Sequence, residues 1–187
     1  MKKFLLISIV TLVIFACNNK PSATSETAGN SMSPDTGLSK KSLPVEFADM
    51  KYMTIGKTGL QQLSDGDIDG WMSSFAENAK YFWSAGDSLD GKKAIADYWK
   101  NRRTNVIDSL HYTNDIWLPI KVNQPQKGPD MPGVWLMGWY QFNAKYKNGK
   151  KVGGWIHIDM HFNNNDQIDR LIQYIDRAPI NAALGIK

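Results

Sequence analysis

Residues 134–162 read VWLMGWYQFNAKYKNGKKVGGWIHIDMHF, and this stretch decides the fold. Apolar and polar residues alternate on both sides of Asn148-Gly149, as in two strands that each bury one face. Asn-Gly is the strongest short signal for a hairpin, because both residues tolerate positive φ. We therefore predict strands over 134–147 and 150–162, joined by a two-residue turn.

The length of that turn fixes which side chains share a face. A two-residue turn pairs Lys147 with Lys150, which places Gly138 opposite Asp159. One face then carries the aromatic and polar residues Tyr140, Phe142, Trp155, His157, Asp159 and His161. The reverse face carries Trp135, Met137, Trp139, Ile158, Met160 and Phe162 and is almost entirely apolar. The polar face is the candidate site.

The flanking chain predicts an α+β domain. Helical spacing of apolar residues predicts helices over 45–63, 68–75 and 92–103, and strands are predicted over 79–83, 111–122 and 167–177. The stretch 85–91 has the composition of a loop. Because the helices precede an antiparallel sheet, we expect three N-terminal helices packed on one face of that sheet.

The N-terminus has the layout of a secretory signal. Lys2-Lys3 is followed by an apolar run over 4–15, which is too short to span a bilayer. Ile14-Phe15-Ala16-Cys17 resembles a bacterial lipobox, which would make 1–16 a removed signal peptide and Cys17 a lipidated residue. An ordinary signal peptide with an incidental cysteine, or an uncleaved anchor, is the alternative. Several acyl chains on Cys17 would hold the protein stably on a membrane of the cell envelope.

Composition separates a linker from a domain. Residues 17–43 hold the cysteine and a stretch rich in Ser, Thr, Gly, Asn and Pro, which predicts a flexible tether. Residues 44–187 are predicted to form one domain. Cys17 is the only cysteine, so this domain has no disulfide.

Charge and motifs exclude several classes of function. The net charge of +4 includes Lys2 and Lys3 of the predicted signal, so the chain gives no sign of a nucleic-acid partner. The sequence has no glycine-rich phosphate loop, no GxSxG and no cysteines at metal-binding spacing. We expect neither a cofactor nor a resident metal.

Three interpretations of the polar face remain open. An antiparallel sheet often has one wet face, and His157, Asp159 and His161 are compatible with that. The same residues suit the polar end of an apolar cavity. A metal site is the third interpretation, although neighbours on one face of a strand lie about 6.5–7 Å apart and no second cluster of ligands is present.

Two segments resemble the SnoaL-like proteins of the nuclear transport factor 2-like superfamily. Residues 66–79, GDIDGWMSSFAENA, resemble the family's first conserved segment, and residues 89–95, LDGKKAI, are similar to the start of its third helix. The similarity continues through Gly138 and the turn at Asn148 to the last strand. It implies a cone-shaped fold in which three helices close over a curved, mainly antiparallel sheet and leave a pocket.

The resemblance also implies site residues. Asp159 stands nine residues before Ile168, where the polyketide cyclases of this family have their acid/base aspartate. Tyr140 stands where those cyclases have a histidine, and Asp176 matches an aspartate that closes the last strand. In an apolar pocket, desolvation would raise the pKa of Asp159 and suit it to proton transfer.

The candidate residues divide by role. Those with acid/base or hydrogen-bonding chemistry are Asp159, Tyr140, His157 and His161. Those expected to contact a flat, ring-bearing ligand are Trp71, Phe75, Trp83, Trp99, Phe142, Trp155 and Asp176, although aromatic residues of this kind also build simple cores.

Three functions compete. The first is an anchored lipoprotein that binds a small molecule, and the second is a cofactor-independent isomerase, cyclase or dehydratase with Asp159 as general acid/base. The third is an interaction module that dimerises through the outer face of its sheet. Fold alone does not choose among them.

Overall fold

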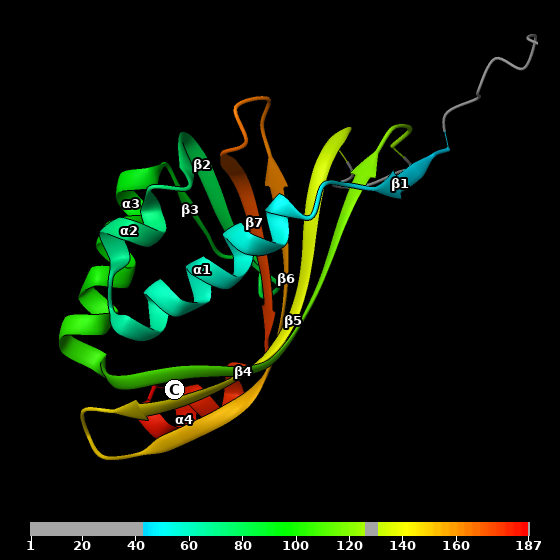
Figure 1. Cartoon of the computed structure of the whole chain (residues 1–187). Coiled ribbons are helices and arrows are strands. Elements are labelled where there is room, and N and C mark those ends of the chain that lie inside the picture. The colour runs from blue at the N-terminus through cyan, green and yellow to red at the C-terminus, as the bar shows by residue number, and fades with distance from the viewer. Residues whose placement is uncertain (1–42, 126–130, 187) are drawn as a thin grey trace, which may run out of the picture. The chain divides into compact units, whose positions relative to one another are not determined.

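The computed structural model describes residues 43–125 and 131–186 (Figure 1). The predicted signal peptide, Cys17 and nearly all of the linker lie outside these residues. No helix in the described ranges is long and apolar enough to cross a membrane. The elements in chain order are β1 (Val45–Phe47), α1 (Lys51–Asp65), α2 (Ile68–Met72), β2 (Phe75–Trp83), β3 (Ser88–Asp90), α3 (Lys92–Asn101), the π-helical turn η1 (Arg102–Val106), β4 (Ile107–Val122), β5 (Gly133–Tyr146), β6 (Lys151–Phe162), β7 (Ile168–Ile175) and α4 (Ala178–Leu184).

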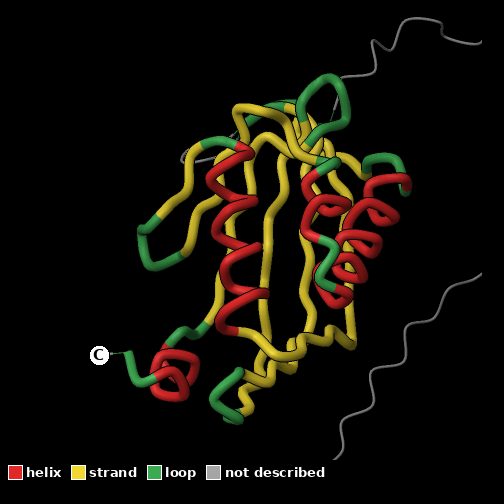
Figure 2. The backbone as a smooth tube through the Cα atoms, turned by 90° about the vertical axis from the view of Figure 1, so that its left-hand side faces the viewer, coloured by secondary structure: helices red, strands yellow, loops and turns green. Residues whose placement is uncertain are grey.

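One curved, seven-stranded sheet organises the domain. Its strand order is β1-β4-β5-β6-β7-β2-β3, and every pair is antiparallel except β2 with β7. The three helices α1, α2 and α3 lie on one side of this sheet (Figures 1 and 2). The predicted α+β fold, with three helices on a curved, mainly antiparallel sheet, is confirmed. We call the side that faces the helices the inner face and the other side the outer face.

Helix α1 lies close to the inner face because of a glycine. A Cβ atom added to Gly56 would lie 2.8 Å from Leu136 Cδ2 and 2.8 Å from Trp117 Cζ3. The helix therefore lacks a side chain where the sheet is nearest, and Leu60 and Leu63 fill the space beside it. It ends at Gly66, which adopts a left-handed φ of 80°.

Two element boundaries near the N-terminus differ from the prediction. Residues 45–47, expected to be helical, form β1 because they pair with the end of β4 at Ile120–Val122. Helix α2 ends at Met72, and Phe75, predicted to be its last residue, begins β2. Strand β2 thus starts four residues before the predicted 79, and it pairs with the short strand β3 inside the predicted loop.

The C-terminal helix α4 was not predicted. Strand β7 stops at Ile175, and the side chain of Asp176 accepts a hydrogen bond from Ala178 N at 2.9 Å. Pro179 stands in the first turn of α4, and Gly185 ends the helix with a φ of 70°. An aspartate just before the helix, an early proline and a late glycine are the usual signals of a short helix, and here they lie within the predicted last strand and beyond it.

Candidate functional site

The turn between β5 and β6 has three residues instead of two. Tyr146 N donates to Lys150 O at 2.8 Å, and Gly149 N donates to Tyr146 O at 2.9 Å. Gly149 has a φ of 84°, whereas Asn148 is not among the residues of positive φ. The two-residue type I′ turn needs positive φ at both central positions, so this loop is of the three-residue kind that ends in a left-handed glycine.

The longer turn shifts the pairing by one residue. Phe142 pairs with Gly154 and Gln141 with Trp155, so the predicted register is wrong. Because the side chains of a strand alternate between faces, a shift of one residue moves each side chain of β6 to the opposite face of the sheet. Ile156, Ile158, Met160 and Phe162 therefore belong to the buried core.

His157, Asp159 and His161 consequently lie on the outer face. The expectation that Asp159 shares a cavity with Tyr140 is wrong, because Tyr140 projects from the inner face and is only 3% exposed. Its ring packs against Tyr112 and Trp117 at centroid distances of 5.2 and 5.9 Å. Burial raises the pKa of Tyr140 well above its ordinary value, so the phenol is a neutral core group.

On the outer face, the His157 ring lies between the rings of Trp139 and Tyr174, with centroids 4.6 and 5.2 Å away. Its Nδ1 is 3.1 Å from Gly138 O, and its Nε2 is 3.0 Å from Asp159 Oδ1. Burial raises the pKa of Asp159, and the nearby His157 opposes part of that rise. The pair is held by stacking against the sheet. Asp159 also lines an open hollow of about 220 Å³ on the outer face, together with Ile120, Val122, Trp135, Met137, Ile172 and Tyr174.

His161 has a structural role on the same face. Its Nδ1 lies 2.6 Å from Asp169 Oδ1, and its Nε2 lies 3.2 Å from Pro132 O. Both ring nitrogens thus meet acceptors, and the ring packs edge-on against Trp135 at 5.0 Å. These contacts fasten the start of β5 to β6 and β7.

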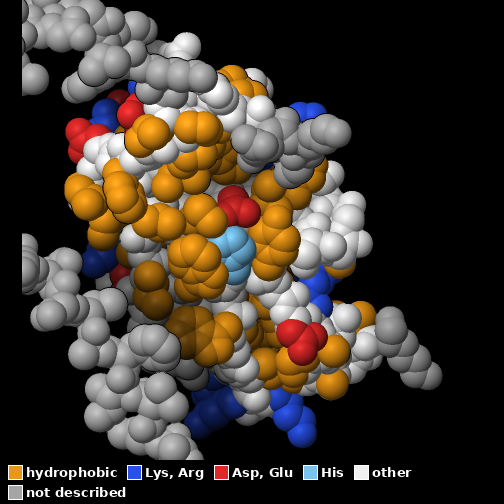
Figure 3. Space-filling view, turned by 90° about the vertical axis from the view of Figure 1, so that its right-hand side faces the viewer, with side chains coloured by type: hydrophobic (Ala, Val, Ile, Leu, Met, Phe, Trp, Pro, Cys, Tyr) orange, Lys and Arg blue, Asp and Glu red, His pale blue; other side chains and the backbone are white. Residues whose placement is uncertain are grey.

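The surroundings of these histidines are mostly apolar. Strand pairing places Leu118, Met137, Asp159 and Ile172 in one row across β4 to β7, and Ile116, Trp139, His157 and Tyr174 in the next. Trp155, predicted to contact a ligand in the pocket, is 53% exposed here. Figure 3 shows apolar side chains gathered around a histidine and a carboxylate on this face.

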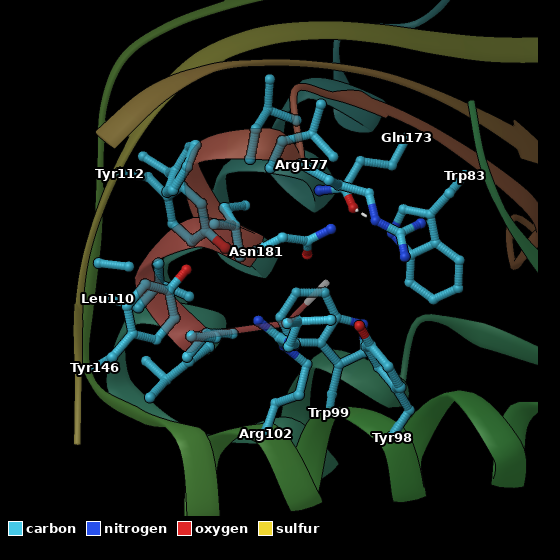
Figure 4. A pocket seen from close by; sticks show the side chains of 18 residues that line it. Trp83, Tyr98, Trp99, Arg102, Leu110, Tyr112, Tyr146, Gln173, Arg177 and Asn181 are labelled. Atoms are coloured by element: carbon cyan, nitrogen blue, oxygen red, sulfur yellow. Dashed lines mark hydrogen bonds between the residues drawn. The ribbon is translucent and has the colours of Figure 1, made fainter. Parts of the chain in front are cut away.

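A cavity of about 210 Å³, partly open to solvent, lies on the inner face, at the end of the sheet where α3 and α4 approach it (Figure 4). Of the residues predicted to contact a ligand, Trp83, Trp99 and Phe142 line it. Trp71 and Phe75 are in the core instead, with exposures of 3% and 0%, because the space beneath α1 and α2 is filled. Asp176 accepts a hydrogen bond from Ala178 N at the start of α4 and does not line the cavity.

The remaining lining residues were not predicted. Those with polar groups are Tyr98, Arg102, Tyr112, Tyr146, Gln173, Arg177 and Asn181, and those that are apolar are Ile107, Leu110, Ala144, Ile156, Ile175, Ile180, Leu184 and Ile186. Alternation along β5 would have placed Ala144 and Tyr146 beside Phe142, and alternation along β7 would have placed the polar Gln173 on the apolar face of Leu171 and Ile175. The lining residues on α4 belong to a helix that was not predicted from the sequence.

Gln173 is held in one orientation. Tyr81 Oη and Trp83 Nε1 donate to its Oε1 at 2.8 and 2.9 Å, and the indole N–H is a donor that only an oxygen can satisfy. No described residue accepts a hydrogen bond from the amide nitrogen of Gln173. The NH₂ group of Gln173 is therefore the part of this amide that can donate a hydrogen bond to a ligand in the cavity.

Two arginines supply the charge of the cavity. Arg177 Nη1 is 2.6 Å from Asp87 Oδ1, so its charge is compensated, and its guanidinium lies 5.7 Å from the Trp83 ring. The guanidinium of Arg102 lies 5.7 Å from the Tyr98 ring and makes no ion pair with a described residue. No carboxylate or histidine is among the described lining residues.

The phenols of the cavity are hydrogen-bonding groups and not bases. Burial raises the pKa of Tyr112 far above its ordinary value, and it also raises the pKa of Tyr146. With these phenols neutral, the cavity offers aromatic faces, hydrogen-bond donors and positive charge. Within the described ranges, no group of three or more His, Cys, Asp or Glu residues is arranged to hold a metal ion.

Comparison with known proteins identifies the fold. No family model matches the chain, and no curated protein matches it. Among solved structures, a candidate isomerase of Bacillus subtilis matches 73% of this chain and 94% of its own length, with a TM-score of 0.57 and 16% identity. A candidate polyketide cyclase of Xanthomonas campestris matches 72% and 97%, with a TM-score of 0.58 and 13% identity.

A third similar structure carries the fold's name. It is a nuclear transport factor 2-like protein of unknown function from Burkholderia pseudomallei, which matches 70% of this chain and 95% of its own length, with a TM-score of 0.56 and 12% identity. The chain therefore has the nuclear transport factor 2-like fold. At these identities the likeness concerns the fold alone.

Proposed function

We propose that this protein is a lipid-anchored protein of the bacterial cell envelope that binds a small, single-ring molecule in the cavity between the sheet, α3 and α4. The observation that carries the proposal is the lining of that cavity. It combines aromatic walls with a few fixed polar groups, which is the usual make-up of a small-molecule site. Its volume of about 210 Å³ suits one ring with a substituent, since a cavity of about 150 Å³ accepts benzene.

The cavity favours binding over proton transfer by a carboxylate. General acid/base chemistry needs a group that changes protonation near neutral pH within reach of the ligand. Asp159 and His157 lie across the sheet from the cavity, and the buried phenols keep their protons. The similar structures include a candidate isomerase and a candidate cyclase, but the residue that the resemblance assigns to acid/base chemistry is outside this cavity.

Filling the cavity tests the proposal. Ala144→Phe from β5 and Leu184→Trp from α4 each place a large side chain where the ligand would lie, whereas Ala85→Phe changes an exposed turn and serves as control. Binding of single-ring probes such as benzyl alcohol and benzoate to the full-length protein would be followed by ligand-observed NMR, with folding checked by circular dichroism. We expect both filled variants to lose binding and the control to keep it. Equal binding by folded Ala144→Phe and wild type would refute the proposal.

Anchoring is tested separately. The lipobox resemblance at 14–17 supports acylation of Cys17, and the tether that follows would let the domain stand away from the membrane. In cells fed a palmitate analogue, wild-type protein should be labelled and Cys17→Ser should not. Labelling that persists in Cys17→Ser would exclude this anchor.

A further inference from the structure

Arg102 occupies an unusual point of the backbone. Helix α3 ends at Asn101 and continues as the π-helical turn η1, and wide turns of this kind occur frequently at functional sites. The next residue, Arg103, turns away and donates from Nη2 to Ser64 O at 3.1 Å in the last turn of α1. Arg102 instead extends from the end of α3 toward the middle of the cavity (Figure 4). The two consecutive arginines thus point to different parts of the domain, and of the two only Arg102 lines the cavity.

The charge of Arg102 is not balanced by the described part of the chain. Its neighbour in the cavity, Arg177, is paired with Asp87, and the other polar groups there are neutral amides and phenols. The positive charge of Arg102 partly opposes the burial-driven rise in the pKa of Tyr146, and Arg103 followed by Arg102 does the same for Tyr112. A guanidinium that lines a cavity without an ion pair is stabilised most by an anion that it can contact with two parallel hydrogen bonds.

Size and donor chemistry narrow the class of anion. Of the two guanidinium groups that line the cavity, only that of Arg102 lacks an ion pair with a described residue, which matches a monoanion, and the planar fork of arginine matches a carboxylate. The amide nitrogen of Gln173 adds a further donor, while Trp99 and Phe142 provide flat walls for a ring. We infer that the ligand of the cavity is a monocyclic carboxylate and that Arg102 binds its carboxylate group. This inference rests on the proposed function, since it names the ligand class of the same cavity.

Comparing the binding of benzoate with that of benzamide separates the effect of ligand charge from that of ligand shape. The two probes have nearly the same size, but only benzoate carries a charge. Binding to the full-length protein would be measured by ligand-observed NMR titration for wild type, Arg102→Gln and Arg102→Lys. The control is Arg170→Gln, because Arg170 also lies over an aromatic ring, 5.3 Å from that of Phe82, and makes no ion pair with a described residue.

We expect wild type to bind benzoate at least tenfold more tightly than benzamide, in line with a charge-assisted hydrogen-bonded pair. Arg102→Gln should weaken benzoate binding far more than benzamide binding and so remove that preference, Arg102→Lys should keep part of it, and Arg170→Gln should keep all of it. Equal affinity of wild type for the two probes, or equal weakening of both in folded Arg102→Gln, would overturn the inference while leaving the cavity as the binding site. If wild type binds neither benzoate nor benzamide, the inference fails. If wild type also binds no other neutral single-ring probe, the proposed function fails as well.

Discussion

Asp159→Asn tests whether the carboxylate lies on the outer face. The Asp159 side chain is 19% exposed, and its Oδ1 is buried without a well-formed hydrogen bond to any described residue, although His157 Nε2 is 3.0 Å away. His157 Nδ1 faces Gly138 O, which can only accept, so in a neutral ring the lone pair of Nε2 faces the carboxylate. The amide introduced by the substitution can donate an N–H to that lone pair and carries no charge to desolvate.

We expect Asp159→Asn to stabilise the protein at neutral pH. A buried polar group without a partner costs about 1–3 kcal/mol, and the partial exposure of Asp159 places the gain near the lower limit, about 1 kcal/mol. For a domain of this length, that corresponds to an increase in melting temperature of about 3–5 °C. Thermal unfolding followed by circular dichroism would measure it.

The pH dependence follows from the direction of the pKa shift. Burial raises the pKa of Asp159 in the folded state above its ordinary value of 3.8. Below that value the carboxyl is protonated in both states and carries no penalty. As pH rises through the folded-state pKa, the folded protein must ionise a poorly solvated group, so wild type loses stability relative to the unfolded chain. The advantage of Asp159→Asn should therefore be present at neutral pH and vanish below about pH 4.

A matched variant and a binding measurement complete this test. Asp169→Asn alters the other His–Asp pair of the outer face and should destabilise, because Asp169 Oδ1 is only 2.6 Å from the buried His161. Ligand binding in the cavity should be unchanged by Asp159→Asn. Destabilisation by Asp159→Asn at pH 7, or a gain that persists at pH 3, would refute the reasoning.

Two further predictions concern packing. Gly56→Ala improves helix propensity by about 1 kcal/mol but places a methyl group 2.8 Å from Leu136 and Trp117, where overpacking costs about 1–3 kcal/mol. We therefore expect urea unfolding to show a net loss of stability. A variant more stable than wild type would contradict the close approach of α1 to the sheet. The apolar outer face predicts self-association, because the polar side chains at its centre, His157 and Asp159, are themselves mostly covered by apolar neighbours. Met137→Lys should shift wild-type dimers to monomers in sedimentation analysis, and a monomeric wild type at about 100 μM would contradict this prediction.

Much of the architecture could be predicted because it depends on local patterns. Alternation in β5 and β6 and the helical spacing in α3 each come from burial of one face of one element, so the sequence of that element is sufficient. The strand β1 was missed because three residues gain their structure only by pairing with the distant end of β4. The resemblance to SnoaL-like proteins gave the order of the elements but carried Asp159 into a cavity that it does not face.

The site could not be predicted because the register of the hairpin depends on distant contacts. Lys147 N donates to Val106 O at 3.0 Å, and Asn148 Nδ2 donates to Ala183 O at 2.9 Å. These bonds hold the turn against η1 and α4, and they accompany a backbone in which Gly149 alone is left-handed. Asn-Gly by itself favours the shorter turn, so the sequence near the turn predicted the wrong face for every side chain of β6.

The same contacts connect the register to the composition of the cavity. Both η1 and α4 touch the β5–β6 turn, and both contribute lining residues, Arg102 from η1 and Asn181 from α4. With the three-residue turn, Ile156 faces inward, whereas the two-residue turn would have turned His157 and Asp159 inward beside Tyr140. A shift of one residue therefore exchanges a cavity that contains a carboxylate for one whose described charges are guanidinium groups. That exchange favours recognition of an anion over abstraction of a proton, because the walls can donate hydrogen bonds and attract negative charge but contain no carboxylate or imidazole to accept a proton.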